Sequence, residues 1–402
     1  MNKQNIRHIA IALLMTLAGL LLAAAAIDPG LPTGYWDNPS ASPDESQHHW
    51  SVLEKDLSPE ACAQCHSSQF NSWKKSLHAD AYSSGLIGQF PAMGHVEGNN
   101  CLECHAPLQE QKYRNQPDMN QSIALKLKHG DGFDIEGELG GKELPLRHSG
   151  VSCAVCHVRG GKRFGPPPKN SAAVGVQKGA AHGGFTATRA FEQSQFCASC
   201  HQFPQSMAIN GKPLENTLVE WKQSTFSKKG VTCQQCHMPD RRHEFRGIHD
   251  AEMVRKGLEF KLRKSKDSVI FTMISTWIGH AFPTYVTPKV IVLADALDRD
   301  GKSLRQWRWE IVREVEYDNG WQEKRDTRLM PGERRDFIAS PLPEKALRVR
   351  YRVTVIPDHF YKGIYQGLLA DQMTANARTH IRKASAQANR NDYLLYQQEL
   401  DL

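Results

Sequence analysis

The sequence predicts an α+β fold: a region of short helices and long loops, then a small antiparallel β-domain, then a helix at the C-terminus. Three observations support this. All cysteines lie between positions 62 and 236, in a stretch where glycine and proline are frequent. After about Arg263 the chain alternates β-branched and polar residues, as a half-buried sheet does. Beyond Leu368, apolar residues recur at helical spacing.

The N-terminus resembles a targeting segment. Lys3 and Arg7 precede an apolar run over residues 9–27 that ends in four consecutive alanines. This pattern is typical of a cleaved secretory signal, which we assign to residues 1–27. The same run is long enough to remain as a membrane anchor. Residues 28–50 are rich in Pro, Gly, Ser and Asp, and we predict an exposed leader there.

Every cysteine belongs to one of five copies of Cys-x-x-Cys-His. This is the attachment signature of c-type haem. The two cysteines form thioethers to the haem, and the histidine that follows binds the iron. A thioredoxin-like redox pair or a zinc site needs no histidine after every pair, so we reject both. The motifs are Cys62, Cys65 and His66; Cys101, Cys104 and His105; Cys153, Cys156 and His157; Cys197, Cys200 and His201; and Cys233, Cys236 and His237.

The motifs set the predicted domain boundaries. They follow one another so closely that little polypeptide is left for each haem, and the haems must themselves form the core. We therefore predict a mostly helical and loop-rich multihaem cytochrome c domain built around five haems over residues 51–263. Because covalent haem attachment of this kind takes place outside the bacterial cytoplasm, we expect the protein in the periplasm, anchored to the membrane, or exported to the cell surface.

The last third of the chain has no cysteine. We predict a β-sandwich-like domain over residues 264–366, because β-branched runs are separated by hairpin-type turns at Asp298–Gly301 and Asp318–Gly320. The expected strands are Ser268–Trp277, Lys289–Leu297, Arg305–Glu316 and Leu347–Val355.

We predict a helical segment over residues 367–402. Its apolar positions are Met373, Ala377, Ile381, Ala384 and Ala388, and Tyr393 and Tyr396 continue the spacing.

The second axial position of each iron decides the chemistry. A second histidine closes the site for electron transfer, and an empty position can bind a small substrate. The histidines outside the motifs exceed the number of irons, so every haem could have two. His78 is expected on a helix over residues 67–82. The predicted second ligands are His78, His95, His148, His182, His243, His249 and His280.

Several segments between roughly residues 55 and 300 form a pattern that is shared with known multihaem proteins. They are Trp73–His78, His148–Ser152, Phe164–Pro166, Glu220–Ser224, Cys236–Pro239, His243–Gly247 and Gly279–Thr284. Over this range the chain resembles the cytochrome c-554 family of multihaem cytochromes, with an added β-domain. The resemblance implies that His78 and His148, and also His249 and His280, bind irons other than that of the nearest motif. The chain departs from the family in having five haem motifs where the name-giving type has four.

The expected function is electron transfer along closely spaced haems, because no Walker loop, dinucleotide fingerprint or serine elbow is present and no catalytic residue is expected. The expected partners are other cytochromes or a quinol-oxidising membrane complex, with membrane association through residues 9–27. Two alternatives stay open: an enzyme whose open haem converts a small nitrogen or sulfur compound, and a structural subunit of a surface complex. The net charge of +7 comes without a basic cluster interleaved with aromatics, so no nucleic-acid partner is expected.

Overall fold

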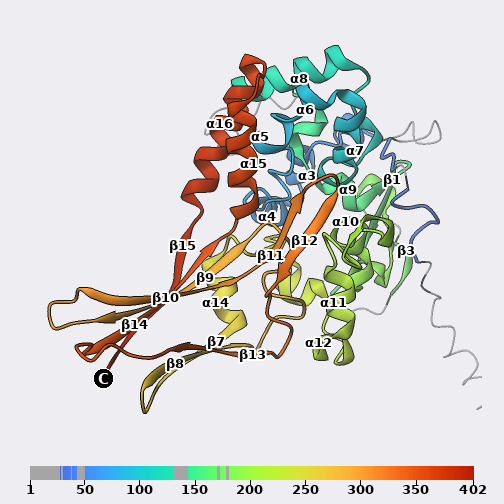
Figure 1. Ribbon diagram of the computed structural model, residues 1–402. Helices are drawn as coiled ribbons and strands as arrows, with labels where there is room; N and C mark the ends of the chain where they lie inside the picture. The colour runs from blue at the N-terminus through green and yellow to red at the C-terminus, as the bar shows by residue number, and fades with distance from the viewer. Residues whose placement is uncertain are drawn as a thin grey trace, which may run out of the picture.

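The computed structural model describes residues 28, 30–37, 39–42, 50–129, 144–169, 173–177 and 181–402. The predicted signal or anchor over residues 1–27 lies outside these residues, and so do residues 29, 38 and 43–49 of the predicted leader. Within them, no helix is long and apolar enough to cross a bilayer. Figure 1 shows a helical part and a strand-rich part, with the C-terminal helices lying against the helical part.

The haem-motif region consists of short helices, as predicted. Several begin at a serine whose side chain accepts a backbone N–H of the first turn, among them Ser51, Ser58 and Ser83. The helices are α2 (Val52–Lys55), α3 (Pro59–Ala63), α4 (Ser67–Trp73), α5 (Ser84–Ile87), α6 (Phe90–Met93), α7 (His95–His105), α8 (Gln116–His129), α9 (Cys153–His157), α10 (Ala198–His201), α11 (Thr217–Gln223), α12 (Thr225–Lys228), α13 (Cys233–His237) and α14 (Ala251–Gly257).

Two small sheets brace the loops of this region. One has the strand order β1-β2-β4-β3, and the other is the hairpin β5-β6. The strands are β1 (Val158–Arg159), β2 (Lys162–Gly165), β3 (Gly175–Gln177), β4 (Phe185–Ala187), β5 (Ala208–Ile209) and β6 (Lys212–Pro213).

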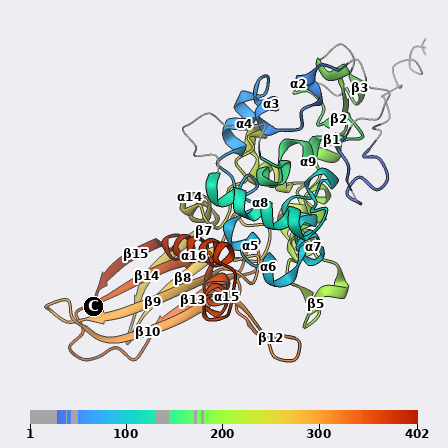
Figure 2. The same ribbon diagram turned by 90° about the horizontal axis from the view of Figure 1, so that it is seen from above.

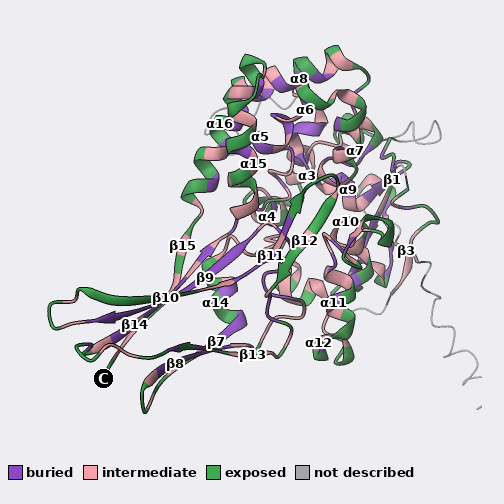
Figure 3. Cartoon of the chain, in the orientation of Figure 1, coloured by how far each residue is buried: buried purple, intermediate pink, exposed green. Residues whose placement is uncertain are grey.

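The predicted β-domain is present as two packed antiparallel sheets, ordered β10-β9-β14-β15 and β13-β8-β7, with a separate hairpin β11-β12. Figure 3 shows β9 buried and β12 largely exposed. The strands are β7 (Leu258–Ser265), β8 (Ser268–Ser275), β9 (Lys289–Leu297), β10 (Ser303–Ile311), β11 (Arg313–Tyr317), β12 (Trp321–Asp326), β13 (Arg334–Ala339), β14 (Arg348–Ile356) and β15 (Tyr393–Asp401).

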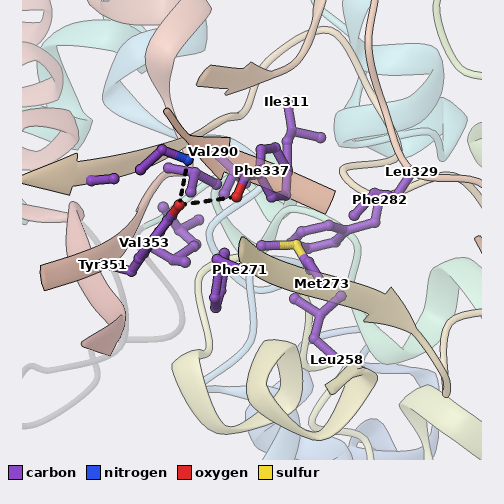
Figure 4. Close-up of a cluster of buried hydrophobic side chains, with 14 of the residues drawn as sticks. Leu258, Phe271, Met273, Phe282, Val290, Ile311, Leu329, Phe337, Tyr351 and Val353 are labelled. Carbon is purple, nitrogen blue, oxygen red and sulfur yellow. Dashed lines mark hydrogen bonds between the residues drawn. The ribbon is translucent and has the colours of Figure 1, made fainter. Parts of the chain in front are cut away.

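The two sheets enclose the largest apolar cluster of the described residues (Figure 4). β14 alternates buried and half-buried residues along its length, as expected for a strand with one face toward a core. Tyr351 lies in this core, and its hydroxyl donates to the carbonyl oxygens of Val269 at 2.8 Å and Phe337 at 3.0 Å. The phenol thereby ties the two sheets together.

Two strand predictions need correction. β7 begins at Leu258, before the boundary predicted between residues 263 and 264, because Leu258, Phe260 and Leu262 alternate with charged residues. The single strand predicted over 305–316 is two strands, β10 and β11. Up to Ile311 the chain pairs with β9, and from Arg313 it pairs with β12. The change occurs at Val312, which is hydrogen-bonded to Thr327.

The C-terminal segment is helical only in part. α15 (His359–Ala370) and α16 (Ala375–Arg390) form the predicted helices, with a cap at Thr374 between them. Residues 393–401 are not helical: they form β15, which pairs along β14. Figure 2 shows α15 and α16 between the sheets and the helical region, and α16 packs against α5 and α8.

Buried polar side chains fasten the β-domain to the haem-motif region. The Arg313 side chain is fully buried and donates to the carbonyls of Ile209, Lys212 and Pro213 in the β5-β6 hairpin. Arg328 forms a 3.0 Å ion pair with the buried Glu220 of α11. The two regions therefore fold against each other rather than as separate modules.

Candidate haem-binding sites

Each haem motif lies on a tight helical turn. α9 and α13 consist of a motif alone, α7 ends on His105, and α10 ends on His201. The first motif runs from α3 to the start of α4, and the backbone N–H of His66 donates to the carbonyl oxygen of Cys62. Residues three apart are neighbours on a helix, so the two sulfur atoms of a motif project from the same side. This is the arrangement that two thioethers to one haem require.

Cysteines of different motifs touch, which places the motifs next to one another. Hydrogen bonds join the thiols of Cys62 and Cys153, of Cys104 and Cys200, and of Cys197 and Cys233. The third and fourth motifs are also close. The pKa of the Cys200 thiol is raised by its bond to Cys104 and by burial, and in addition by Cys156.

Three motif histidines each face a second histidine that is distant in sequence. The ring centres of His201 and His78 lie 6.2 Å apart. Those of His157 and His243 lie 6.1 Å apart. Those of His237 and His280 lie 6.3 Å apart, with the rings inclined by only 13°.

These separations fit an iron held between two imidazoles. Two metal–nitrogen bonds of about 2 Å, with about 1 Å more from each nitrogen to its ring centre, separate the ring centres by about 6 Å. Two rings in direct stacking contact can lie closer, as the centres of His148 and Tyr82 do at 5.0 Å. Of the seven predicted second ligands, the structure brings His78, His243 and His280 to this distance from a motif histidine.

The third and fifth motifs are each positioned by a hydrogen bond from a tryptophan side chain to the backbone just before the motif. Trp73 Nε1 donates to the carbonyl of Val151 at 2.8 Å, and Trp221 Nε1 donates to that of Val231 at 2.9 Å. Each valine lies two residues before the first cysteine of its motif. The motif pairs that these tryptophans connect, first with third and fourth with fifth, are pairs whose thiols touch.

Comparison with known proteins gives two matches. A family model described as outer membrane cytochrome MtrC/MtrF-like, domains II/IV, matches residues 60–250. A penta-heme cytochrome c552 from Thermochromatium tepidum has a similar structure, with a TM-score of 0.57 and 18% identity over 88% of this chain and 100% of that chain. At this identity the likeness concerns the fold. No curated protein matches.

The chain is a multihaem cytochrome c. The matches confirm the class predicted from the cysteine motifs and the α+β fold. They support the broader class, multihaem cytochrome c, that the cytochrome c-554 resemblance implied.

The paired imidazoles of this cytochrome are neutral, the form that binds a metal. Burial lowers the pKa of His78 to about 3, with a smaller contribution from the neighbouring histidines. Burial likewise lowers the pKa of His157, His201 and His280 to about 4.

The Nδ1 atoms of most of these histidines are held by main-chain carbonyls, which leaves Nε2 for a metal. His157 bonds to Phe164 at 2.8 Å, and His237 to Arg246 at 2.7 Å. His243 and His280 bond to the carbonyls of Arg241 and Ala281, each at 3.0 Å. In the second motif, His105 bonds to Ala81 at 2.9 Å.

His78 does not lie on a helix, contrary to the prediction. α4 ends at Trp73, and the Ser76 hydroxyl bonds to the Trp73 carbonyl in a turn. Side-chain bonds of this kind compete with helix continuation. The turn brings the His78 backbone to Val151, whose N–H donates to the His78 carbonyl at 2.9 Å.

Two other predicted ligands have partners of another kind. His148 stacks on Tyr82 with ring centres 5.0 Å apart, and its Nε2 bonds to Ser122 at 2.9 Å. His249 Nε2 bonds to Asp358, in the C-terminal part of the chain, at 3.0 Å. Their role as ligands stays a prediction.

His182 and His95 also stay predictions. The backbone N–H of His182 donates to Glu54 at 2.6 Å, just before the first motif. His95 begins α7, and His105 ends it. At 1.5 Å per residue the two are about 15 Å apart along the axis, so His95 must serve another iron if it serves one.

Two side chains near the fourth motif were missed by the sequence analysis. Tyr285 Oη lies 2.7 Å from His201 Nδ1, and Glu215 lies 3.8 Å from the same nitrogen. Burial raises the pKa of the Glu215 carboxyl to about 8. The one sequence signal was the position of Tyr285, directly after the Gly279–Thr284 segment.

Proposed function

We propose that this cytochrome holds five covalently attached haems, most of them with two histidine ligands, and serves as an electron carrier. Haem iron supplies reversible one-electron chemistry when bound. The observation that carries the proposal is the set of three imidazole pairs 6.1–6.3 Å apart. A closed iron with two strong ligands favours electron transfer over substrate binding.

The pairs assign second ligands to three irons. His243 is proposed for the third motif, His78 for the fourth and His280 for the fifth. For the first and second irons, the remaining predicted ligands are His95, His148, His182 and His249. Among these, His182 lies near the first motif. Its backbone N–H donates to Glu54, the backbone carbonyl of Glu54 is bound by Arg163, and Arg163 is close enough to Cys62 to interact with it electrostatically.

The thiol contacts support an order for the haems. The first motif touches the third, the fourth touches the fifth, and the second touches the fourth. The third is close to the fourth through Cys156. We therefore propose a row in the order first, third, fourth, fifth, with the second branching from the fourth.

The proposed location is outside the cytoplasm, in the periplasm or at the cell surface. Covalent haem attachment and the apolar run at residues 9–27 support this. The matching family model is described as an outer membrane cytochrome, which favours an envelope location. Proposed partners are other cytochromes or a quinol-oxidising membrane complex.

The alternative of an enzyme with an open haem concerns the first and second motifs. Among the described residues, no histidine ring lies at the axial distance from His66 or from His105. A small nitrogen or sulfur compound would bind at one of these irons if that iron has no second ligand.

Mass spectrometry and electron paramagnetic resonance (EPR) test the proposal. The mature protein should carry five haem additions and no free thiol. Replacing His78, His243 or His280 with alanine, one at a time, should each convert one low-spin ferric signal to high-spin without loss of haem. His359→Ala is the matched control and should leave every signal unchanged.

The proposal fails if fewer than five haems are attached, or if all three alanine variants keep the wild-type spectrum. A high-spin signal in the unmodified protein would instead favour the enzyme with an open haem.

A further inference from the structure

The fourth haem site differs from its two neighbours in what its axial histidines bond to. Both imidazoles proposed for the third haem, His157 and His243, donate from Nδ1 to a main-chain carbonyl. Both imidazoles proposed for the fifth, His237 and His280, do the same. At the fourth site, neither imidazole has such an acceptor within the described residues.

The Nδ1 partner of His201 is a phenol. Tyr285 Oη lies 2.7 Å from it, and the two rings are inclined by 13° with centres 6.3 Å apart. Burial raises the pKa of Tyr285 well above its usual value, so the hydroxyl stays neutral. Opposite, the His78 ring rests against Phe245 with centres 4.2 Å apart, and no described residue accepts a hydrogen bond from it.

The acceptor of an axial histidine tunes the metal. A strong acceptor draws the Nδ1 proton, makes the ligand more basic and stabilises the ferric state. A phenol oxygen is a weaker acceptor than an amide carbonyl oxygen, because its lone pair is partly delocalised into the ring. With a weak acceptor on one side and an aromatic ring on the other, the fourth site stabilises ferric iron less than its neighbours do.

We infer that the fourth haem has a higher reduction potential than the third and fifth haems, and that Tyr285 is a positioning residue there, a weaker acceptor than the main-chain carbonyls of those two sites. The inference rests on the proposed ligand assignment. Because the fourth motif touches the second and fifth and lies near the third, this haem would hold electrons at the branch point of the row.

The first test uses the unmodified protein. The ferric EPR signals of the fourth, third and fifth haems are identified as those that are missing from His78→Ala, His243→Ala and His280→Ala, respectively. In a stepwise reductive titration followed by EPR, the signal of the fourth haem should disappear before the other two. If the third or fifth haem accepts an electron first, the inference is wrong. The haem count and the low-spin signals test the proposed function separately.

The second test is Tyr285→Phe, which removes the acceptor and keeps the ring. The potential of the fourth haem should rise and the others should stay where they are. Tyr351→Phe removes a buried phenol in the β-domain core, far from any motif in sequence, and should move no potential. An unchanged or lowered potential of the fourth haem in Tyr285→Phe would overturn the inference.

A third variant separates the phenol from the nearby carboxyl. Glu215→Gln keeps the shape of the side chain that lies 3.8 Å from His201 Nδ1. Because the carboxyl is farther from His201 Nδ1 than the Tyr285 hydroxyl is, Glu215→Gln should shift the potential of the fourth haem less than Tyr285→Phe does. A shift with Glu215→Gln and none with Tyr285→Phe would assign the effect to the carboxyl and refute the role of Tyr285.

Discussion

Gly150 leaves no room for a side chain beside the carbonyl oxygen of His78. A β-carbon at Gly150 would lie 2.6 Å from that oxygen, and the residue has a φ of +56°. The close approach brings the loop before the third motif to the residue proposed as a ligand of the fourth haem. One glycine thus links the positions of two haem sites.

We predict that Gly150→Ala disturbs the fourth haem. Gly160→Ala is a matched control, because Gly160 has a φ of +52° and nothing lies within 4 Å of the position that its methyl group would take. Both changes place a side chain at a positive φ, at a cost of about 1–3 kcal/mol, and the ψ of −133° at Gly150 lies outside the left-handed helical region. Gly150→Ala should lower the free energy of unfolding further and broaden or shift the EPR signal that His78→Ala removes. Equal effects of the two changes would contradict the clash.

The tryptophan bonds before the third and fifth motifs should contribute similar stability. Trp73→Phe and Trp221→Phe each leave a valine carbonyl without its indole partner, at a cost of about 1–3 kcal/mol. Trp321 is 45% exposed, and Trp321→Phe should have little effect. Chemical denaturation of the three variants makes the comparison. A loss at Trp321 as large as at Trp73 would count against the proposed role of the bonds.

Arg313 should be the side chain that holds the β11-β12 hairpin in place. It is fully buried, bonds to three carbonyls and pairs with Glu323 at 2.8 Å. Lysine has a single ammonium group and cannot serve all four acceptors. Arg313→Lys should lower the free energy of unfolding by about 1–3 kcal/mol for each buried carbonyl that it leaves without a donor.

The control for Arg313 is Arg325→Lys on the same hairpin. The Arg325 side chain is 42% exposed and pairs with Glu314 and Glu310. Exposed pairs contribute about 0–1 kcal/mol, so this change should be small. A small loss for Arg313→Lys in thermal denaturation would show that the hairpin is held in another way.

The β-domain should lose stability in acid through Glu310. Burial would raise the pKa of this carboxyl, but its ion pairs with Arg308, Arg325 and Lys289 outweigh burial and lower the pKa to about 2. A pKa below the usual 4.5 stabilises the fold above pH 4.5, and the contribution is lost as the pH falls toward 2.

The variant Glu310→Gln isolates this contribution. The difference in unfolding midpoint between wild type and Glu310→Gln should be largest near pH 7 and should shrink as the pH is lowered below 4.5. A difference that stays constant or grows in acid would contradict the assignment.

The sequence alone determined the cofactor class and most of the strands. Haem attachment is local chemistry, with two thiols and an imidazole within five consecutive residues, so no tertiary contact is needed to recognise it. β9 has the predicted bounds, because a buried strand has a continuous β-branched pattern. Residues 73–76 and 221–224 share a Trp-x-x-Ser frame, and in the structure both tryptophans bond to a valine carbonyl.

Only the tertiary structure decided which histidine faces which motif. His78 and His201 meet across more than a hundred residues, and the contact depends on the turn after Trp73 and the space at Gly150. The strand at residues 393–401 was not predicted either, because the spacing of Tyr393 and Tyr396 also fits a helix. The backbone of this segment pairs instead with the edge of β14. Pairing of this kind depends on which surfaces the fold leaves open, and a local pattern carries no information about that.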